Sequence, residues 1–242
     1  MKRLLLIFFL VSVVGHAADE KKALERVKTA STVMDEIMAA PDKAIPEDLL
    51  GKAECIAVIP SMKKGGFIFG GKYGVGVISC RINNRSAWSA PSTIRIEGGS
   101  FGLQIGGAGT DVVLLVMNQR GAEKLMSSKF TLGGDASVAG GPVGREATAQ
   151  TDAQMHAEIL SYSRSRGVFA GISLSGSTLR PDNDANTEIF GKEVQYKDIL
   201  MGKVPAPSET RVFLNTLAKY AGSKSVSKAV GGKVTKAGPQ TR

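Results

Sequence analysis

The chain has 242 residues, of which 43% are hydrophobic, and it carries a net charge of +9 and 29 glycines. Two of its basic residues lie in the first three positions and five lie in residues 222–242, which leaves 24 basic against 22 acidic residues for 18–221. This near balance argues against a nucleic-acid-binding domain, which would carry a broad basic surface.

The first residues have the three parts of a secretory signal. A positive start at Lys2 and Arg3 precedes an apolar run, and the small residues Gly15 and Ala17 precede a polar stretch. This order predicts a cleaved signal peptide at residues 1–17. A membrane anchor is the competing interpretation, but a spanning helix needs about 20 apolar residues and this run is shorter. We therefore expect an exported protein, periplasmic or extracellular and peripheral at the membrane.

An amphipathic helix is predicted over residues 20–39. Apolar residues recur there at spacings of three, four and seven, while basic residues lie elsewhere around the helix. The apolar positions are Leu24, Val27, Met34, Ile37 and Met38. Pro41 ends this helix, and residues 46–51 are predicted to form one further helical turn closed by a glycine.

The region from Glu54 to Arg180 is predicted to be mainly β-structure, since short runs rich in Ile, Val, Phe and Tyr alternate with turn residues. The predicted strands are Cys55–Ile59, Gly66–Gly70, Tyr73–Arg81, Ser92–Glu97, Phe101–Gly106, Asp111–Met117, Ala136–Ala139, Ile159–Arg164 and Val168–Leu179, with a short helix at Arg120–Ser127. Glycines inside these strands indicate bulges or strong curvature. We expect an α+β domain with a curved, Gly-rich, largely antiparallel β core, either a sandwich or a partly closed barrel, and peripheral N- and C-terminal helices.

The chain contains two cysteines, Cys55 and Cys80. In an exported protein, two cysteines at this spacing are candidates for one disulfide. Two buried thiols, each behaving as a small apolar residue, are the alternative. The sequence leaves both interpretations open.

The C-terminal part returns to helix. Single turns are predicted at Asn186–Phe190 and Lys197–Met201, and a helix capped by Ser208 is predicted to run to about Ala221. The following residues are rich in Ser, Lys and Gly without periodicity, which predicts a disordered basic tail at 222–242. One domain is therefore expected at residues 18–221.

Two segments imitate catalytic motifs. Residues 66–73 have the spacing of a phosphate-binding loop, but Tyr73 stands where a Ser or Thr hydroxyl must reach magnesium. Residues 98–102 match the nucleophile elbow of serine hydrolases around Ser100, but a strand is expected after them where that motif needs a helix. After signal removal, His156 is the only histidine left for a triad. A tight glycine turn in a hairpin is the favoured interpretation, and no catalytic residue is predicted.

Residues 182–193 imitate a calcium loop. Asp182, Asp184 and Asn186 place oxygens at alternate positions and Glu193 stands at the twelfth, but Thr187 occupies the position that needs glycine. An Asx-rich turn is the alternative, and we expect no calcium site. One remaining histidine and two separated cysteines supply too few ligands for a transition metal. The sequence therefore predicts no metal and no cofactor.

Six cations remain as candidates for lipid binding: Lys21, Lys22, Arg26, Lys28, Lys63 and Lys64. The first four accompany the apolar face of the first helix, as in an interfacial helix, although a surface helix packed on the sheet is favoured by sequence alone. The last two precede an aromatic residue in an expected loop, which suits an anionic head group, and a solvated turn is the alternative. Reversing the four helix charges is expected to weaken vesicle binding more than deleting the tail, because the helix supplies both charge and apolar surface.

Seven stretches of the chain resemble the SYLF-domain family in its bacterial exported form, and the resemblance runs from about Ala53 to Leu217. The matching stretches are Cys55–Pro60, Gly66–Gly71, Trp88–Ser92, Gly98–Gly107, Thr110–Met117, Gly141–Arg145 and Ser161–Gly167. The resemblance implies a non-enzymatic, lipid-binding domain, with phosphoinositides as ligands in eukaryotic relatives and actin as a partner in fungal ones. It also implies that the lysine-bearing first helix contributes to lipid binding.

Taken together, the residues and the resemblance predict non-enzymatic binding of an anionic lipid or membrane surface in the cell envelope. The alternative is a structural envelope protein that recognises a protein partner, as in the actin-binding fungal relatives, or that assembles through a β edge. A hydrolase built on Ser100 is the third and weakest alternative. No nucleic-acid partner is expected.

Overall fold

The computed structural model describes residues 21–40, 45–66, 69–101, 109–143, 156–165, 168–171 and 174–222. The expected signal peptide at residues 1–17 and, apart from Gly222, the expected tail lie outside the described residues. Within the described residues, no helix combines the length and the apolarity needed to cross a bilayer.

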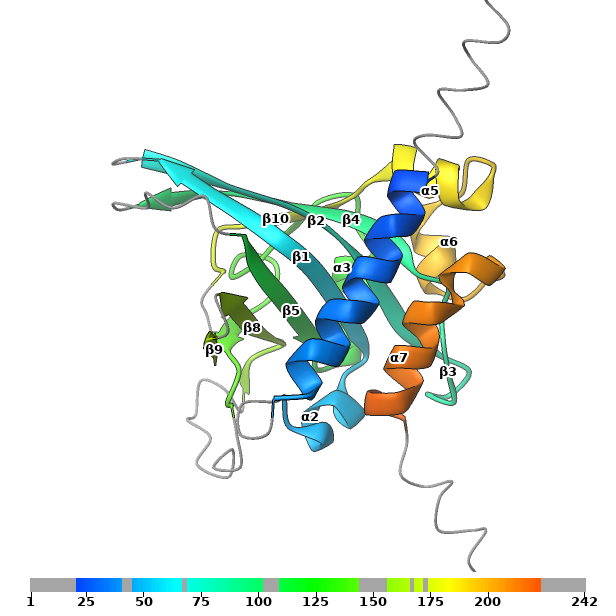
Figure 1. Ribbon diagram of the computed structural model, residues 1–242, viewed down its shortest axis with the longest axis horizontal. Helices are drawn as coiled ribbons and strands as arrows, with labels where there is room; N and C mark the ends of the chain where they lie inside the picture. The colour runs from blue at the N-terminus through cyan, green and yellow to red at the C-terminus, as the bar shows by residue number, and fades with distance from the viewer. Residues whose placement is uncertain are drawn as a thin grey trace, which may run out of the picture.

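A curved mixed sheet forms the centre of the molecule (Figure 1). Its strands are β1 Cys55–Gly66, β2 Phe69–Ile82, β3 Ala87–Trp88, β4 Ser92–Phe101, β5 Thr110–Val116, β6 Phe130–Thr131, β7 Val138–Gly140, β8 Ile159–Ser165, β9 Val168–Gly171 and β10 Thr178–Pro181. The order is β6-β10-β4-β2-β1-β5-β8-β7, with β3 paired to β2 and β9 to β8. Strands β7 and β8 are parallel and the other named pairs are antiparallel. The predicted α+β class with a curved, largely antiparallel core is confirmed.

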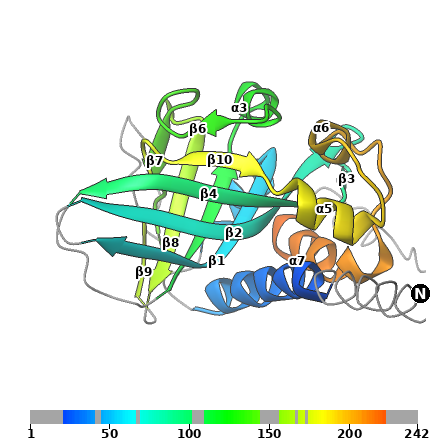
Figure 2. The same ribbon diagram turned by 90° about the horizontal axis from the view of Figure 1, so that it is seen from above.

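The helices pack around this sheet, as Figure 2 shows from above. They comprise the helix of residues 21–38, α2 Glu47–Lys52, α3 Gln119–Leu125, α5 Asn183–Phe190, α6 Tyr196–Leu200 and α7 Arg211–Ala221, with a 3-10 turn at Ser208–Thr210. The helix of residues 21–38 and α7 lie against one side of the sheet, and α3 lies on the other side (Figure 2).

Alternating side chains of β1 divide the core into two apolar layers. Ile56 and Val58 pack with the helix of residues 21–38 and with α7, on what we call the outer face of the sheet. Ala57 and Ile59 point the opposite way and pack with residues of α3 and α6, on the inner face. This division follows from the two-residue repeat of a strand that is buried on both sides.

The first helix uses its apolar face to cover the sheet. Ala23, Val27, Ala30, Met34 and Ile37 repeat at helical spacing and are buried in the outer layer. Burying a Val, Met or Ile side chain contributes about 1.5–3 kcal/mol, so Val27, Met34 and Ile37 hold the helix in place. The interpretation of this segment as a helix packed on the sheet is confirmed, and its apolar face is not free to enter a membrane.

The structure corrects several predicted strand boundaries. The predicted strands at Gly66–Gly70 and Tyr73–Arg81 were wrong, because residues 69–82 form the single strand β2, and Gly66 belongs to β1, where it pairs with Gly70. The predicted strand Val168–Leu179 is instead two strands, β9 and β10. Beyond Phe101, which ends β4, the strand predicted at Phe101–Gly106 falls outside the described residues.

Candidate functional site

Three strands of the sheet continue together past their neighbours. Among the residues that the structure describes, β1 pairs with β5 only as far as Met62, and β4 pairs with β10 only as far as Glu97. Beyond these points β1, β2 and β4 remain paired with one another up to the strand ends at Gly66 and Phe101. We call residues 63–66, 69–73 and 97–101 the β arm, which extends to the upper left in Figure 1.

The β arm is basic. It carries three lysines, Lys63, Lys64 and Lys72, against one acid, Glu97. Lys63 lies directly opposite Tyr73, which in turn lies opposite Glu97, so these three share the outer face. Tyr73 is 52% exposed and is one of only three large apolar side chains of the described residues that are so open to solvent.

Lys64 and Lys72 lie directly opposite each other on the inner face of the arm. Burial, and then the neighbouring charge of Lys64, lower the pKa of Lys72 below its usual value. Like charges placed opposite each other on adjacent strands destabilise the pair, so a bound anion would stabilise it. The prediction that Lys63 and Lys64 lie in a loop was wrong, because both belong to β1, and the contribution of Lys72 was not recognised from the sequence.

The four predicted cations of the first helix lie apart from the arm. Lys21, Lys22 and Lys28 are exposed, whereas Arg26 forms an ion pair with Asp182, Nη1 to Oδ2, at 2.7 Å. The helix begins beside α5, toward the end of the molecule opposite the arm (Figure 1). The structure therefore does not bring the helix cations together with Lys63 and Lys64.

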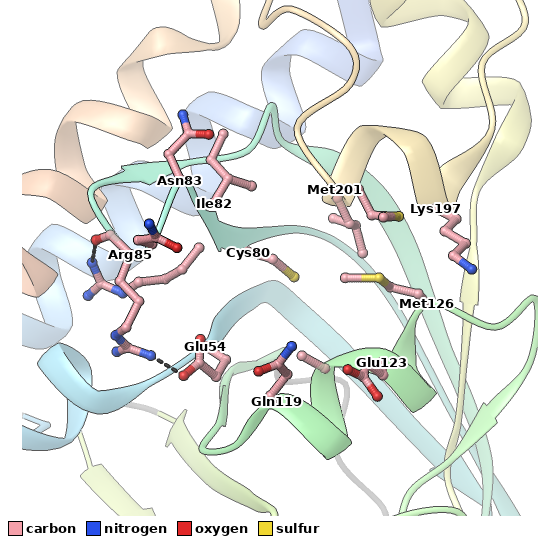
Figure 3. Close-up of a pocket in the computed structure, with 14 residues that line it drawn as sticks. Glu54, Cys80, Ile82, Asn83, Arg85, Gln119, Glu123, Met126, Lys197 and Met201 are labelled. Atoms are coloured by element: carbon pink, nitrogen blue, oxygen red, sulfur yellow. Dashed lines mark hydrogen bonds and ion pairs between the residues drawn. The ribbon is translucent and has the colours of Figure 1, made fainter.

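A pocket of about 900 Å³ lies between the β2–β3 turn, α3 and α6 (Figure 3). Its charged lining includes Glu54, Arg85, Glu123 and Lys197, and its apolar lining includes Ile82, Met126, Leu200 and Met201. Arg85 already pairs with Glu54, as the dashed line in Figure 3 marks. The pocket mixes apolar and charged groups without assembling a recognisable catalytic set.

Arg81 and Arg85, which line this pocket, hold the ends of two helices. Arg81 donates through Nη2 to the carbonyl oxygen of Leu50, at 3.5 Å, and to that of Ala221. These two residues lie in the last turns of α2 and α7, respectively. Burial lowers the pKa of Arg81 below its usual value, and its guanidinium lies 4.3 Å from the centre of the Trp88 ring. Helix C-termini leave carbonyls without intrahelical partners, so Arg81 is a shared cap of α2 and α7.

Replacing Arg81 by methionine is expected to lower the free energy of unfolding by about 2 kcal/mol, because carbonyls bonded to a charged donor lose their partner. Arg81→Lys should recover only part of this loss, since one ammonium cannot reproduce the guanidinium fork. Urea denaturation followed by fluorescence reports both, as Trp88 is the single tryptophan of the chain. Arg120→Met is the control, because its side chain is 77% exposed, and it should change stability by less than about 0.5 kcal/mol. Equal stability of the Arg81 variants and the parent would contradict the capping role.

The segments that imitate catalytic motifs have other structures. Gly66 ends strand β1 and residues 69–73 begin strand β2, so Lys72 and Tyr73 lie in a strand and not at the start of a helix, as a phosphate-binding loop requires. Gly98, Gly99 and Ser100 lie inside β4 and pair with β2, so they form neither the elbow nor the hairpin turn that the sequence suggested. The predicted glycine turn at residues 98–102 was wrong, because a glycine-rich strand here runs through positions that usually mark a turn.

The calcium-like segment is a helix. Residues 183–190 form α5, and Asn186 is buried with its side-chain oxygen accepting hydrogen bonds from Thr93 N and Oγ1, both at 2.8 Å. Asp182 is engaged by Arg26. These oxygens therefore tie α5 to β4 and to the first helix, and no group of three or more potential metal ligands occurs among the described side chains.

Comparison of the sequence with known proteins identifies a family and several relatives. A family model described as "Ysc84: Las17-binding protein actin regulator" matches residues 97–220. The chain is 38% identical over 194 residues to LAS seventeen-binding protein 3 of Saccharomyces cerevisiae, which covers 78% of this chain and 41% of that protein. It is 37% identical over 181 residues to SH3 domain-containing YSC84-like protein 1 of Rattus norvegicus, covering 74% of this chain and 53% of the relative. The chain thus spans about half or less of the length of these relatives.

Proposed function

Because the chain belongs to the Ysc84 family, the SYLF-domain family, we propose that it is a non-enzymatic binding protein that contacts an anionic lipid surface through the β arm. A binding role agrees with the family, whose description names a binding protein and actin regulator. The signal peptide expected at residues 1–17 makes the cell envelope the proposed compartment.

The charge of the β arm is the observation that supports this proposal most directly. Lys63, Lys64 and Lys72 surround one end of the molecule with Glu97 as the single acid, and the aromatic ring of Tyr73 is exposed between them. Basic residues held near an anionic surface contribute about 1 kcal/mol each, and tyrosine favours the membrane–water interface. A narrow basic projection can approach a membrane without any change in the rest of the fold.

The first helix has a smaller part in this proposal than the sequence suggested. Its apolar face is buried in the outer layer, so it can offer charge but not insertion. Lys21 and Lys28 are exposed and add to the attraction, whereas Arg26 is held by Asp182. The basic residues of 222–242 are a further electrostatic accessory.

Vesicle flotation tests the proposal. The protein is expected to float with vesicles that contain phosphatidylglycerol and poorly with vesicles of phosphatidylcholine alone, and its binding should weaken as salt rises, because exposed charges are screened over about 8 Å at physiological ionic strength. The triple variant Lys63→Gln, Lys64→Gln, Lys72→Gln should lower the affinity roughly tenfold or more, since three charges leave the contact surface.

A matched triple variant on the first helix, Lys21→Gln, Lys22→Gln, Lys28→Gln, removes the same charge from a different place. It should lower the affinity less than the arm variant does. Equal losses in the two triple variants would show that only net charge matters and would reject the arm as the contact site. Binding to neutral and anionic vesicles alike would reject the electrostatic mechanism.

A protein partner is the second candidate, and the names of the relatives favour it. The outer edges of β1 beyond Met62 and of β4 beyond Glu97 are paired with no described strand. Such edges can accept an extended peptide as an added strand. Folded protein that floats with neither kind of vesicle would favour this candidate over lipid binding.

A further inference from the structure

Two arginines face each other at the base of the β arm. Arg95 of β4 lies directly opposite Arg180 of β10 in the antiparallel register. Their neighbours Ile94, Ile96 and Leu179 are buried in the inner layer, so both arginines project from the outer face. This is the face that carries Tyr73 and Lys63 one row further along the arm.

The two guanidiniums have few acceptors. Glu97 Oε1 lies 3.1 Å from Arg95 Nε, but no carboxylate of the described residues lies within ion-pair distance of Arg180. Both Nε atoms are shielded from water: that of Arg95 has Glu97 as its ion-pair partner, without hydrogen-bond geometry, and that of Arg180 makes no hydrogen bond within the described part of the chain. Asp182, the closest acid to Arg180 along the chain, accepts from Arg26 at 2.7 Å.

This arrangement is unfavourable in the absence of an anion. Like charges directly opposite on adjacent strands repel, and Glu97 offsets only the charge of Arg95. The shielded Nε–H of Arg180 loses its hydrogen bond to water without replacement. Arg95 nevertheless keeps 40% of its side chain exposed, so a solute can reach the pair. An oxyanion placed between the two guanidiniums, reached through the exposed part of Arg95, would neutralise the repulsion.

We propose that Arg95 and Arg180 form a binding site for a phosphate monoester. Guanidinium groups bind phosphate oxygens through two parallel hydrogen bonds, and a monoester dianion offers three oxygens and nearly two charges to two arginines. A carboxylate offers only two oxygens and one charge, which Glu97 already supplies to Arg95. The inference rests on the proposed function in one respect, since a lipid head group is the source of phosphate that the β arm would meet.

Glu97 is a built-in competitor for this site. The carboxylate of Glu97 lies on the same face and neutralises part of the charge of Arg95. An incoming phosphate must therefore overcome repulsion by this carboxylate. Glu97→Gln keeps the shape of the side chain and removes the charge. Phosphate should then bind roughly fivefold more tightly, whereas Arg180→Gln should weaken binding roughly tenfold or more.

The test uses the soluble full chain and the arginine Nε–Hε resonances in nuclear magnetic resonance spectra. Titration with inorganic phosphate and with glycerol 3-phosphate should shift the signals of Arg95 and Arg180 in a saturable way and leave that of the exposed Arg211 in place. Arg180→Gln should abolish the saturable shift at Arg95, and Arg211→Gln should not. Thermal melting checks that the variants fold, and Arg180→Gln should melt no lower than the parent because it removes a repulsion.

Vesicles then separate the two sources of phosphate. Phosphatidic acid carries a monoester and phosphatidylglycerol a diester, so a lipid site predicts tighter flotation with the former that Arg180→Gln removes. If the soluble phosphate esters bind but the protein shows no preference for phosphatidic acid vesicles, the site binds a free phosphate compound. The proposal of a phosphate site would then stand, and membrane recognition through this site would be rejected. Equal, unsaturable shifts at all arginines, or none at Arg95 and Arg180, would overturn the site itself.

Discussion

Gly76→Ala is expected to destabilise the protein by about 4 kcal/mol, a large part of the roughly 5–15 kcal/mol by which a folded domain is typically stable. A β-carbon at position 76 would lie 2.2 Å from the carbonyl oxygen of Val58 and 2.8 Å from Cα of Ile59. Both are backbone atoms of the paired strand β1, so no side-chain rotation relieves the clash. The close approach occurs where the β1–β2 register shifts between Val58 and Lys63. Thermal and urea denaturation measure the loss.

Gly71→Ala is the matched control on the same strand. A β-carbon there meets no atom within 4 Å, so alanine should change the stability by no more than about 0.5 kcal/mol. If both variants unfolded at the urea concentration of the parent, the packing of β2 on β1 would not be as tight as described. If both were destabilised alike, a general cost of replacing glycine in this strand would explain the effect in place of the clash.

The class of the fold could be predicted because local patterns carry it. The 3.6-residue repeat of Val27, Met34 and Ile37 predicts the first helix, and the β-branched runs predict the core strands. The length of β2 could not be predicted in the same way, because Gly70, Gly71 and Gly74 interrupt its apolar alternation and read as turns. Only pairing with β1 and β4, which lie on either side of it, makes these glycines part of a strand.

The candidate site could be predicted only where its residues are neighbours in sequence. Lys63 and Lys64 stand together, so their charge is visible, although their place in a strand is not. Lys72 joins them through the hairpin register, and Arg180 meets Arg95 through a pairing that spans 85 positions of the chain. No local pattern reports such a pairing, because it follows from which strands become neighbours in the sheet.

The choice between a disulfide and two thiols at Cys55 and Cys80 likewise depended on register. The two residues are direct partners across β1 and β2, with their Cα atoms 4.0 Å apart, and they are joined by a disulfide. The sequence had placed the second cysteine on a third strand, but it lies on the second because β2 is continuous. The bond therefore closes the base of the hairpin whose far end is the β arm.

Breaking this disulfide is expected to lower the free energy of unfolding by about 3 kcal/mol. The bond links two residues that are 25 positions apart, and by closing this loop it lowers the conformational entropy of the unfolded chain. The double variant Cys55→Ala, Cys80→Ala should show this loss in urea denaturation, and added reductant should destabilise the parent but not the double variant. Both cysteines are buried, so reduction of the parent should require partial unfolding first. Thiol counting on denatured, unreduced protein from an oxidising compartment should find none. Two free thiols there would contradict the bond, and the base of the hairpin would then be held by strand pairing and the surrounding core alone.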